Sequence, residues 1–277
     1  MKEALNKSFS YHEQNGIEYY TVPAFTASGL VIHAFSGRNG GYSEGGYGTL
    51  NLGLLTDDDP ELVVRNRKKF CEVVGIDPNS IVGTEQVHGD RVLKVTQAEK
   101  GHGALDKDSV IPGVDALMTN ERGVSLTAYY ADCVPVLFLD PVLKVIGVAH
   151  AGWKGTFAKI AAKTVQAMAA EYGCRPELLL VGIGPSIGPC HYEVDEPVLE
   201  IVKEAFPAWW KTLLEKSNAT GATHLDLWEA NRKQLCDVGV KEENITVCRM
   251  CTYCLPEKFF SYRAGMPGRQ MVVITLK

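Results

Sequence analysis

The chain has 277 residues, of which 45% are hydrophobic and 22% are charged, and its formal net charge at pH 7 is -5. This composition is ordinary for a globular protein. The negative net charge argues against a general electrostatic attraction to nucleic acid or an anionic membrane, which needs a basic face, but it leaves room for local basic pockets. No run of about eighteen apolar residues could span a bilayer, and residues 1–16 lack the apolar core of a secretory signal, so we expect a cytoplasmic protein.

The eight cysteines are too sparse for a disulfide scaffold, which is typical of much shorter secreted chains. In a reducing compartment they remain thiols. Each cysteine is therefore a core residue, a metal ligand or a nucleophile.

The first half of the chain alternates apolar runs with turns and one helix. A glycine-rich stretch at 37–53 follows an apolar run at 29–35 and precedes a predicted helix at 59–75. Glycine lets the backbone approach a ligand closely, so this stretch is either a loop at a binding site or a flexible connection. Segments 80–95 and 113–130 are rich in β-branched residues and contain turn signals, which predicts strands.

The segment at 155–173 predicts an amphipathic helix with Gly173 as its C-terminal cap. Its apolar face comprises Phe157, Ile160, Ala161, Thr164, Val165 and Met168.

The remaining segments are short and mixed. An apolar run at 177–188 predicts a buried strand, 194–206 and 225–239 predict helices, and 259–265 and 269–276 predict strands. Several connections are too short for crossovers between parallel strands. We therefore expect an α+β fold in which mixed β-sheets pack with helices, rather than a doubly wound parallel fold.

Two strand-like runs, at 134–140 and 144–150, are joined by a very short connection, which forces antiparallel pairing. If the turn lies at 141–142, Cys133 pairs with His150. A loop that is one or two residues longer shifts the register but leaves both residues at the open end of the hairpin. The hairpin therefore brings a thiol and an imidazole close together.

Two kinds of site use a thiol beside an imidazole. Either Cys133 is a nucleophile with His150 as its base, or both are ligands of a metal ion. A metal needs a third protein ligand, and His88 in the polar turn at 84–92 is the best candidate, with His191 as a reserve ligand.

These motifs resemble the YfiH/YlmD family of purine nucleoside phosphorylases, once described as polyphenol oxidases or laccases, and its YlmD-type members in particular. The matching segments span residues 35 to 275, in order: FSGRNGGYSEGGYGTLNLG, NRKKF, EQVHGDRV, VDALMT, YYADCVPVLFLDP, GVAHAGWKGT, GIGPSIGPCHYEV, CTYCLPEKFFSYR and GRQMVVITL. The resemblance implies a single domain over residues 1–277, similar to the deamidase domain of cytotoxic necrotizing factor toxins.

The resemblance also implies a zinc site formed by His88, Cys133 and His150, with copper binding possible in vitro. It further implies that the chain cleaves adenosine, inosine, guanosine and methylthioadenosine with phosphate and that it deaminates adenosine.

Phosphorolysis requires a partner for the phosphate dianion. Arg38 is the first candidate because its planar guanidinium binds anions in a bidentate manner. This sequence retains the arginine of the family motif at position 38, although Gly37 replaces the threonine of many relatives. Arg263 is the second candidate, and a structural ion pair is an equally good explanation for it. Asp132 either orients a metal-binding histidine, carries a proton or caps a turn, and Glu85 is a weaker candidate for acid–base catalysis.

Three further cysteines follow a pattern that the family does not share. The family commonly carries only the equivalent of Cys251, whereas this chain has Cys248, Cys251 and Cys254 at regular intervals. They form either an extra metal or redox site or, more simply, a group of thiols around a strand end, because no fourth ligand is evident. Cys190 and Cys236 are further candidates that no motif supports.

Other functions remain open. A multicopper oxidase needs several His-x-His pairs for its trinuclear cluster, and this sequence has none, so copper bound at one His–Cys–His site would be adventitious. One rival is a metal-free hydrolase or deamidase with Cys133 as nucleophile and His150 as base, in which His88 has no required role. Another is a module that binds a nucleoside without turnover.

Overall fold

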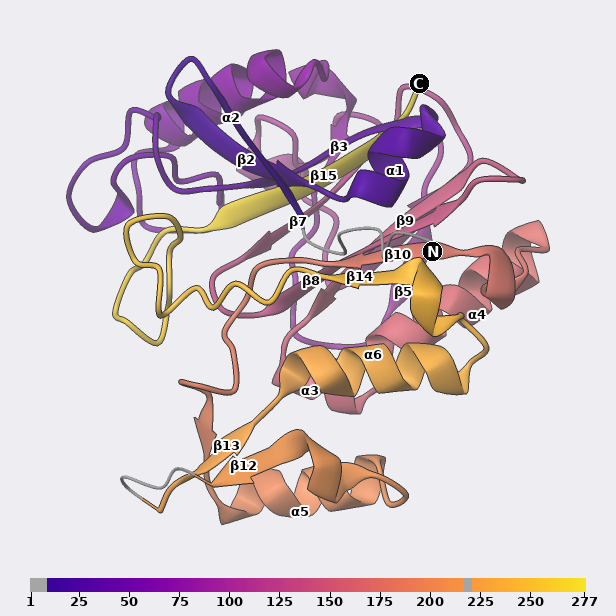
Figure 1. Cartoon of the computed structure of the whole chain (residues 1–277). Helices are drawn as coiled ribbons and strands as arrows, with labels where there is room; N and C mark the ends of the chain where they lie inside the picture. Colours follow the sequence, from indigo (N-terminus) through magenta and orange to yellow (C-terminus); the bar gives the residue numbers. More distant parts are fainter. Residues whose placement is uncertain (1–8, 217–220) are drawn as a thin grey trace, which may run out of the picture.

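Two six-stranded β-sheets lie face to face, with helices on their outer faces (Figure 1). The structure is a computed structural model and describes residues 9–216 and 221–277. The first sheet has the order β1 (Ser10–Gln14), β2 (Ile17–Thr21), β3 (Val31–Ser36), β15 (Gln270–Leu276), β7 (Ser125–Tyr130) and β4 (Ile81–Val82). The second has the order β14 (Ile245–Val247), β10 (Leu180–Ile183), β8 (Val134–Asp140), β9 (Val145–Ala151), β6 (Ala116–Thr119) and β5 (Val92–Lys94).

Both sheets combine parallel and antiparallel pairs. The pairs β4 with β7, β5 with β6, and β10 with β14 are parallel. The other pairs in the two sheets are antiparallel. The predicted fold class, mixed sheets packed with helices, is therefore confirmed.

Side-chain alternation along the strands divides the core into layers. On β15, Val272 and Ile274 pack between the two sheets, whereas Met271 and Val273 pack on the opposite face against α2 (Pro60–Val74). Successive side chains of a strand point to opposite faces, so a continuous apolar run can contribute to two cores.

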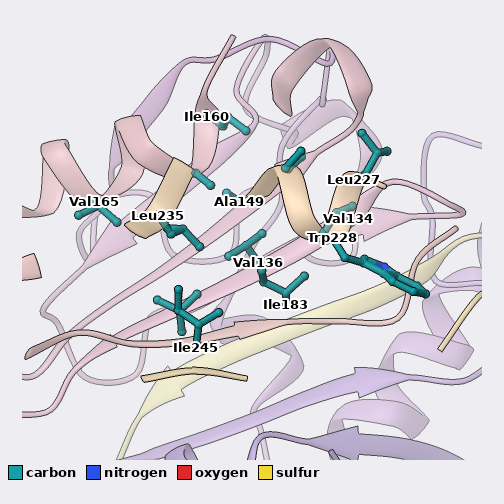
Figure 2. Packing of buried hydrophobic residues seen from close by; sticks show 14 of the residues in the cluster. Val134, Val136, Ala149, Ile160, Val165, Ile183, Leu227, Trp228, Leu235 and Ile245 are labelled. Carbon is teal, nitrogen blue, oxygen red and sulfur yellow. The ribbon is translucent and has the colours of Figure 1, made fainter. Parts of the chain in front are cut away.

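The outer face of the second sheet packs against α4 (Ile160–Tyr172) and α6 (Leu227–Asp237) (Figure 2). The sheet contributes Val134, Val136, Ala149, Ile183 and Ile245, and the helices contribute Ile160, Val165, Leu227, Trp228 and Leu235. Burial of a large aliphatic side chain contributes about 1.5–3 kcal/mol to stability. This layer therefore holds β8 and β9 firmly in place.

The remaining elements lie around the two sheets. Two short helices are α1 (Pro23–Ser28) and α3 (Trp153–Phe157), which directly follows β9. A small antiparallel sheet has the order β11 (Glu193–Val194), β13 (Thr223–Leu225) and β12 (Leu214–Lys216), and α5 (Glu196–Ala205) lies beside it at the opposite end of the molecule from α2 (Figure 1). The 3₁₀ helices are η1 (Gly45–Tyr47), η2 (Pro78–Ser80), η3 (Lys107–Ser109), η4 (Pro176–Leu178), η5 (Trp210–Leu213) and η6 (Glu242–Asn244). Within residues 9–216 and 221–277, no helix has both the length and the apolar character required to cross a bilayer.

Most of the predicted elements are present. The helices α2, α5 and α6 lie within the predicted segments 59–75, 194–206 and 225–239. At α2, the Asp59 carboxylate accepts the Glu61 N–H and caps the first turn. The predictions of one domain over 1–277 and of an N terminus without a secretory signal extend to residues 1–8 and 217–220, which lie outside the described residues.

The prediction of one helix at 155–173 is wrong, because α3 and α4 are separate helices. Between them, Lys159 adopts a left-handed backbone conformation with φ of 64°, which interrupts the helical hydrogen bonds. All six residues of the predicted apolar face are nevertheless buried. Gly173 ends α4 with φ of 75°, as predicted.

The predicted strand at 259–265 is also wrong, because this segment forms turns. Its two phenylalanines are buried, which explains the apolar pattern. The N–H of Arg263 donates to the carboxylate of Asp132 at 2.7 Å, and the N–H of Gly265 donates to the carbonyl of Tyr262 at 2.9 Å. The bond between Gly265 and Tyr262 closes a turn, and the bond between Arg263 and Asp132 holds that turn against the segment before β8.

The strands β8 and β9 form the predicted antiparallel hairpin, but in a shifted register. Pro135, rather than Cys133, pairs with His150, because the loop spans residues 141–144. The Asp140 carboxylate accepts hydrogen bonds from two backbone N–H groups of this loop and so stabilises the longer turn. Cys133 precedes β8 and His150 lies near the end of β9, so both remain at the open end of the hairpin.

Candidate metal centre

Three side chains that can bind a metal ion meet at the open end of this hairpin. His88 comes from the loop between β4 and β5, Cys133 precedes β8, and His150 belongs to β9. One donor atom of each lies within 4.8 Å of the other two. The two imidazole rings meet edge to face, with their centroids 4.9 Å apart. We call these residues the His–Cys–His group.

Asp115, directly before β6, holds two parts of this group in place. Its buried carboxylate lies 2.9 Å from Nδ1 of His150. When Nδ1–H donates to this carboxylate, Nε2 is the nitrogen available to a metal ion. The same carboxylate accepts the backbone N–H groups of Val87, His88 and Gly89 at 3.1, 3.0 and 2.8 Å. Asp115 thus fixes the ring of one histidine and the loop that carries the other.

Gly152 has no side chain, and its absence makes room for His88 and Cys133. A Cβ atom at this position would lie 2.8 Å from Cδ2 of His88 and 2.9 Å from Sγ of Cys133. Both distances are well inside normal contact between heavy atoms. The φ of -62° is open to any residue, so this position requires a small residue because of space and not because of backbone freedom.

Without a metal ion, the group favours a thiolate beside an imidazolium. Burial raises the pKa of the Cys133 thiol, but the charge of His150 and hydrogen bonds from both histidines lower it to about 6. Burial lowers the pKa of His150, but the Cys133 thiolate and the Asp115 carboxylate raise it to about 9. Burial also raises the pKa of Asp115, but its hydrogen bonds hold that pKa below the ordinary value. At neutral pH, Cys133 is therefore in the thiolate form that binds metal ions.

The His–Cys–His group forms part of the wall of a cavity of about 500 Å³. This volume is within the range of small-molecule sites. Other parts of the wall include Leu54, Thr84, Gln86, Tyr129, Tyr262 and Arg269. Tyr262 is 70% exposed, and the guanidinium of Arg269 lies 5.7 Å from the centre of its ring. The wall therefore combines metal donors, aromatic faces and a cation.

Asp132 does not line this cavity. One oxygen of its carboxylate accepts the Thr252 hydroxyl at 2.6 Å, and the other accepts the backbone N–H of Arg263 at 2.7 Å. In the structure the carboxylate that contacts His150 is that of Asp115, whereas the carboxylate of Asp132 contacts Thr252 and Arg263. Glu85 is exposed and also lies outside the cavity wall.

Neither of the two arginines suggested as phosphate ligands lines the cavity. The guanidinium of Arg38 donates to the carbonyls of Gly48 and Pro256, at 2.5 and 2.8 Å. The guanidinium of Arg263 donates to the carbonyl of His191 at 3.2 Å. In this structure both guanidinium groups tie loops together.

Three residues at the site were not identified from the sequence: Asp115, Gly152 and Arg269. Asp115 gave a usable signal, because a carboxylate between apolar residues at the start of a strand needs a buried partner. Gly152 and Arg269 gave none, since their importance depends on neighbours that are distant in sequence.

Comparisons with known proteins show which proteins this chain resembles. The model of a family described as "Multi-copper polyphenol oxidoreductase laccase" matches residues 32–277. The chain is 40% identical over 246 residues to the protein named purine nucleoside phosphorylase YlmD of Geobacillus stearothermophilus, covering 88% of this chain and 89% of that protein. It is 39% identical over 249 residues to the protein of the same name from Bacillus subtilis, covering 89% of each.

Two solved structures have the same fold. The crystal structure of YlmD from Geobacillus stearothermophilus matches with a TM-score of 0.90 at 36% identity, covering 97% of this chain and 98% of that one. The Bacillus licheniformis hypothetical protein YfiH matches with a TM-score of 0.90 at 34% identity, covering 96% and 99%. Since the family model and these relatives match most of the chain, it belongs to the YfiH/YlmD family.

Proposed function

We propose that this chain is a zinc-dependent purine nucleoside phosphorylase that acts on adenosine, inosine, guanosine and methylthioadenosine and that also deaminates adenosine. The observation that carries this proposal is the convergence of His88, Cys133 and His150 on the wall of a cavity of about 500 Å³. The names of the Geobacillus and Bacillus relatives support the reaction class. A reducing compartment keeps cysteines such as Cys133 as thiols, so we place the activity in the cytoplasm.

The donor set fits zinc. Two imidazoles and one thiolate are ligands that zinc prefers, and three protein ligands leave one tetrahedral position for a reactant. When bound, zinc supplies Lewis acidity to an oxygen atom of the reactants. Copper would bind the same donors in vitro because its affinity for nitrogen and sulfur ligands exceeds that of zinc. The sequence has no His-x-His pair to support a trinuclear copper cluster.

In phosphorolysis, a phosphate oxygen forms a bond to C1′ of the ribose as the bond from C1′ to the purine nitrogen breaks. The electron pair of the broken bond stays with the purine, which takes up a proton. The protein contributes mainly by positioning the two reactants. Asp115 holds His150 and the loop of His88, and the exposed ring of Tyr262 offers a face on which a purine can stack.

Two arginines line the cavity, and Arg269 is the better placed for phosphate because the buried guanidinium of Arg67 donates to three backbone carbonyls. The Nη1 of Arg269 donates to the carbonyls of Pro267 and Gly268. Among the described residues, no hydrogen bond uses its Nε or Nη2, so these donors are available to an anion. Arg38 and Arg263 remain predicted phosphate ligands, but each would first have to leave the carbonyls that it now binds.

In deamination, water adds at C6 of adenine and ammonia leaves. The same cavity serves this reaction if the purine, rather than the ribose, is turned toward the His–Cys–His group.

A metal-free cysteine hydrolase is the second candidate, and one observation favours it. Cys133, His150 and Asp115 form a thiol, imidazole and carboxylate series, the arrangement that activates cysteine nucleophiles. In this mechanism the thiolate attacks an amide carbonyl and the imidazolium gives its proton to the leaving amine. His88 has no necessary part in it.

Product analysis separates these functions. The purified protein is incubated with adenosine, with and without phosphate, and the products are resolved by chromatography. We expect adenine and ribose 1-phosphate only when phosphate is present, and inosine under both conditions. Removal of zinc should abolish both reactions, and added zinc should restore them.

Three other outcomes would contradict the proposal. Amide hydrolysis that persists in zinc-free protein and in a His88→Ala variant would identify a cysteine hydrolase. Nucleoside binding without product in the zinc-loaded protein would identify a binding module. Adenine release without phosphate would identify a nucleosidase.

A further inference from the structure

A second group of potential metal ligands lies outside the cavity. One donor atom from each of Cys190, His191, Cys251 and Cys254 lies within 4.8 Å of the others. The first two residues belong to the loop after β10 and the last two to the loop after β14, and these strands are paired neighbours. None of the four lines the cavity of the His–Cys–His group. We call them the loop cluster; Cys248 is not a member.

Two separations within the loop cluster are close to those of tetrahedral coordination. Sγ of Cys190 lies 3.5 Å from Sγ of Cys254, which lies 3.2 Å from Nδ1 of His191. Zinc bonds of about 2.3 Å to sulfur and about 2.0–2.1 Å to nitrogen place tetrahedral ligand atoms about 3.8 Å and about 3.6 Å apart. The observed distances are shorter by about 0.3 Å and about 0.4 Å, so small side-chain rotations would bring the donors to these positions.

We propose that the loop cluster binds one zinc ion in a closed, structural site. Three thiolates and one imidazole are a donor set of structural zinc, and the two-residue spacing between Cys251 and Cys254 is typical of it. Four protein donors leave no position for a reactant. The N–H of Gly188 donates to Sγ of Cys251 at 3.3 Å, which offsets part of the negative charge of the thiolates.

A zinc ion in this position ties together two loops that support the His–Cys–His group. Both loops reach Asp132: the N–H of Ile187 donates to its carbonyl at 2.9 Å, and the Thr252 hydroxyl donates to its carboxylate at 2.6 Å. Asp132 has φ of 81° and directly precedes Cys133. The position of the Cys133 thiolate therefore depends on the loops that the second ion joins.

A disulfide between Cys190 and Cys254 is the competing outcome. It would form by loss of two protons and two electrons to a thiol oxidant such as another disulfide. That reaction would leave the imidazole of His191 without a role. The ring of His191 is instead held toward the thiols by stacking on Tyr253, with centroids 4.3 Å apart, and this arrangement favours a metal site.

The test counts zinc ions per chain in full-length protein purified without chelators. We expect two ions in the wild type and one in a Cys190→Ser/Cys254→Ser double variant. We expect one ion in Cys133→Ser, because the loop cluster does not require the His–Cys–His group. Cys236→Ser is the matched control, since this half-buried thiol of α6 belongs to neither group, and it should keep two ions.

Two further readouts are independent of enzyme activity. The double variant should have a Tm lower than that of Cys236→Ser by at least about 4 °C, because a bound structural ion stabilises the folded state. Cys133→Ser refilled with cobalt should show the strong charge-transfer absorption of a site with three thiolates, and the added Cys190→Ser/Cys254→Ser changes should abolish it.

Two results would overturn the proposal. One is a single zinc ion in the wild type that is lost in Cys133→Ser. The other is a wild-type chain lighter by two hydrogen atoms, with its disulfide mapped to Cys190 and Cys254. Because Cys133→Ser isolates the loop cluster, failure of the proposed enzyme activity would leave this test intact.

Discussion

Replacing Gly152 with alanine tests whether the His–Cys–His donors share one ion. The new Cβ would lie 2.8 Å from Cδ2 of His88 and 2.9 Å from Sγ of Cys133. Carbon atoms pack best at about 3.5–4.0 Å, so the ring of His88 must retreat by about 0.7 Å. Metal–ligand distances tolerate only about 0.2 Å of change. The backbone accepts alanine because φ is -62°, so the strain falls on the two ligands.

We expect the affinity of Gly152→Ala for zinc to fall by about 10- to 100-fold, the range caused by loss of groups that position metal ligands. Competition with a chromophoric chelator measures this affinity, and adenine release measures phosphorolysis. Activity at limiting zinc should fall in parallel. Excess zinc should restore part of it, because all three donors are still present.

Gly46→Ala is the matched control for this substitution. Its Cβ would meet only the ring of Pro267, at 3.1 Å, so we expect wild-type zinc affinity and activity. If Gly152→Ala also bound zinc with wild-type affinity and kept wild-type turnover, the reasoning from this close approach would be refuted.

Three other changes test separate parts of the account. Asp115→Asn should lower zinc affinity by about 10- to 100-fold, because the amide cannot replace the charged acceptor that orients His150 and the loop of His88; unchanged affinity in chelator competition would contradict this. Arg269→Ala should raise the KM for phosphate by at least about tenfold while Arg38→Ala leaves it nearly unchanged, and the reverse pattern in steady-state kinetics would support the original choice of Arg38. In zinc-free protein, alkylation of Cys133 by iodoacetamide should rise with pH and reach half its maximum rate near pH 6, because the thiolate is the reacting form. Peptide mass spectrometry measures this rate; a midpoint near the ordinary value of about 8.5, or no protection by zinc, would contradict it.

Helices and strands in which apolar residues recur at regular intervals were predictable, because the interval indicates which face is buried. The helix α2 also carries explicit end signals, Asp59 and Gly75. The same logic explains the error at 155–173. Since α3 and α4 bury residues into the same cluster, the apolar pattern continues across Lys159 and does not reveal the break.

Short strands with few buried residues gave no comparable signal. In β1 and β11 none of the residues is fully buried, so their sequences lack the alternation of a half-buried strand. Their pairing is set by neighbouring segments and not by their own composition.

The meeting of Cys133 and His150 was predictable although the proposed register was wrong. The real register differs from the predicted one by two positions, since Pro135 and not Cys133 pairs with His150. A shift of two keeps side chains on the same face of the sheet, whereas a shift of one would have reversed them. The hairpin therefore brings Cys133 and His150 together even though its loop is longer than predicted.

Contacts between distant segments could not be derived in this way. Asp115 joins the loop of His88 to β9, and no pattern in the sequence around Asp115 indicates which residues its partners are. The grouping of Cys190 and His191 with Cys251 and Cys254, in place of Cys248, was missed for the same reason. Its two halves meet because β10 pairs in parallel with β14, and β14 is too short to be recognised as the partner of a strand so far away in sequence.

The most direct test of the metal-centred active site is an anomalous difference map. Crystals grown from protein purified without added metal would be measured on both sides of the zinc absorption edge. We predict a zinc peak bonded to His88, Cys133 and His150, with its fourth side toward the cavity. The absence of a peak at these three residues, or a peak that does not contact His88, would contradict the account.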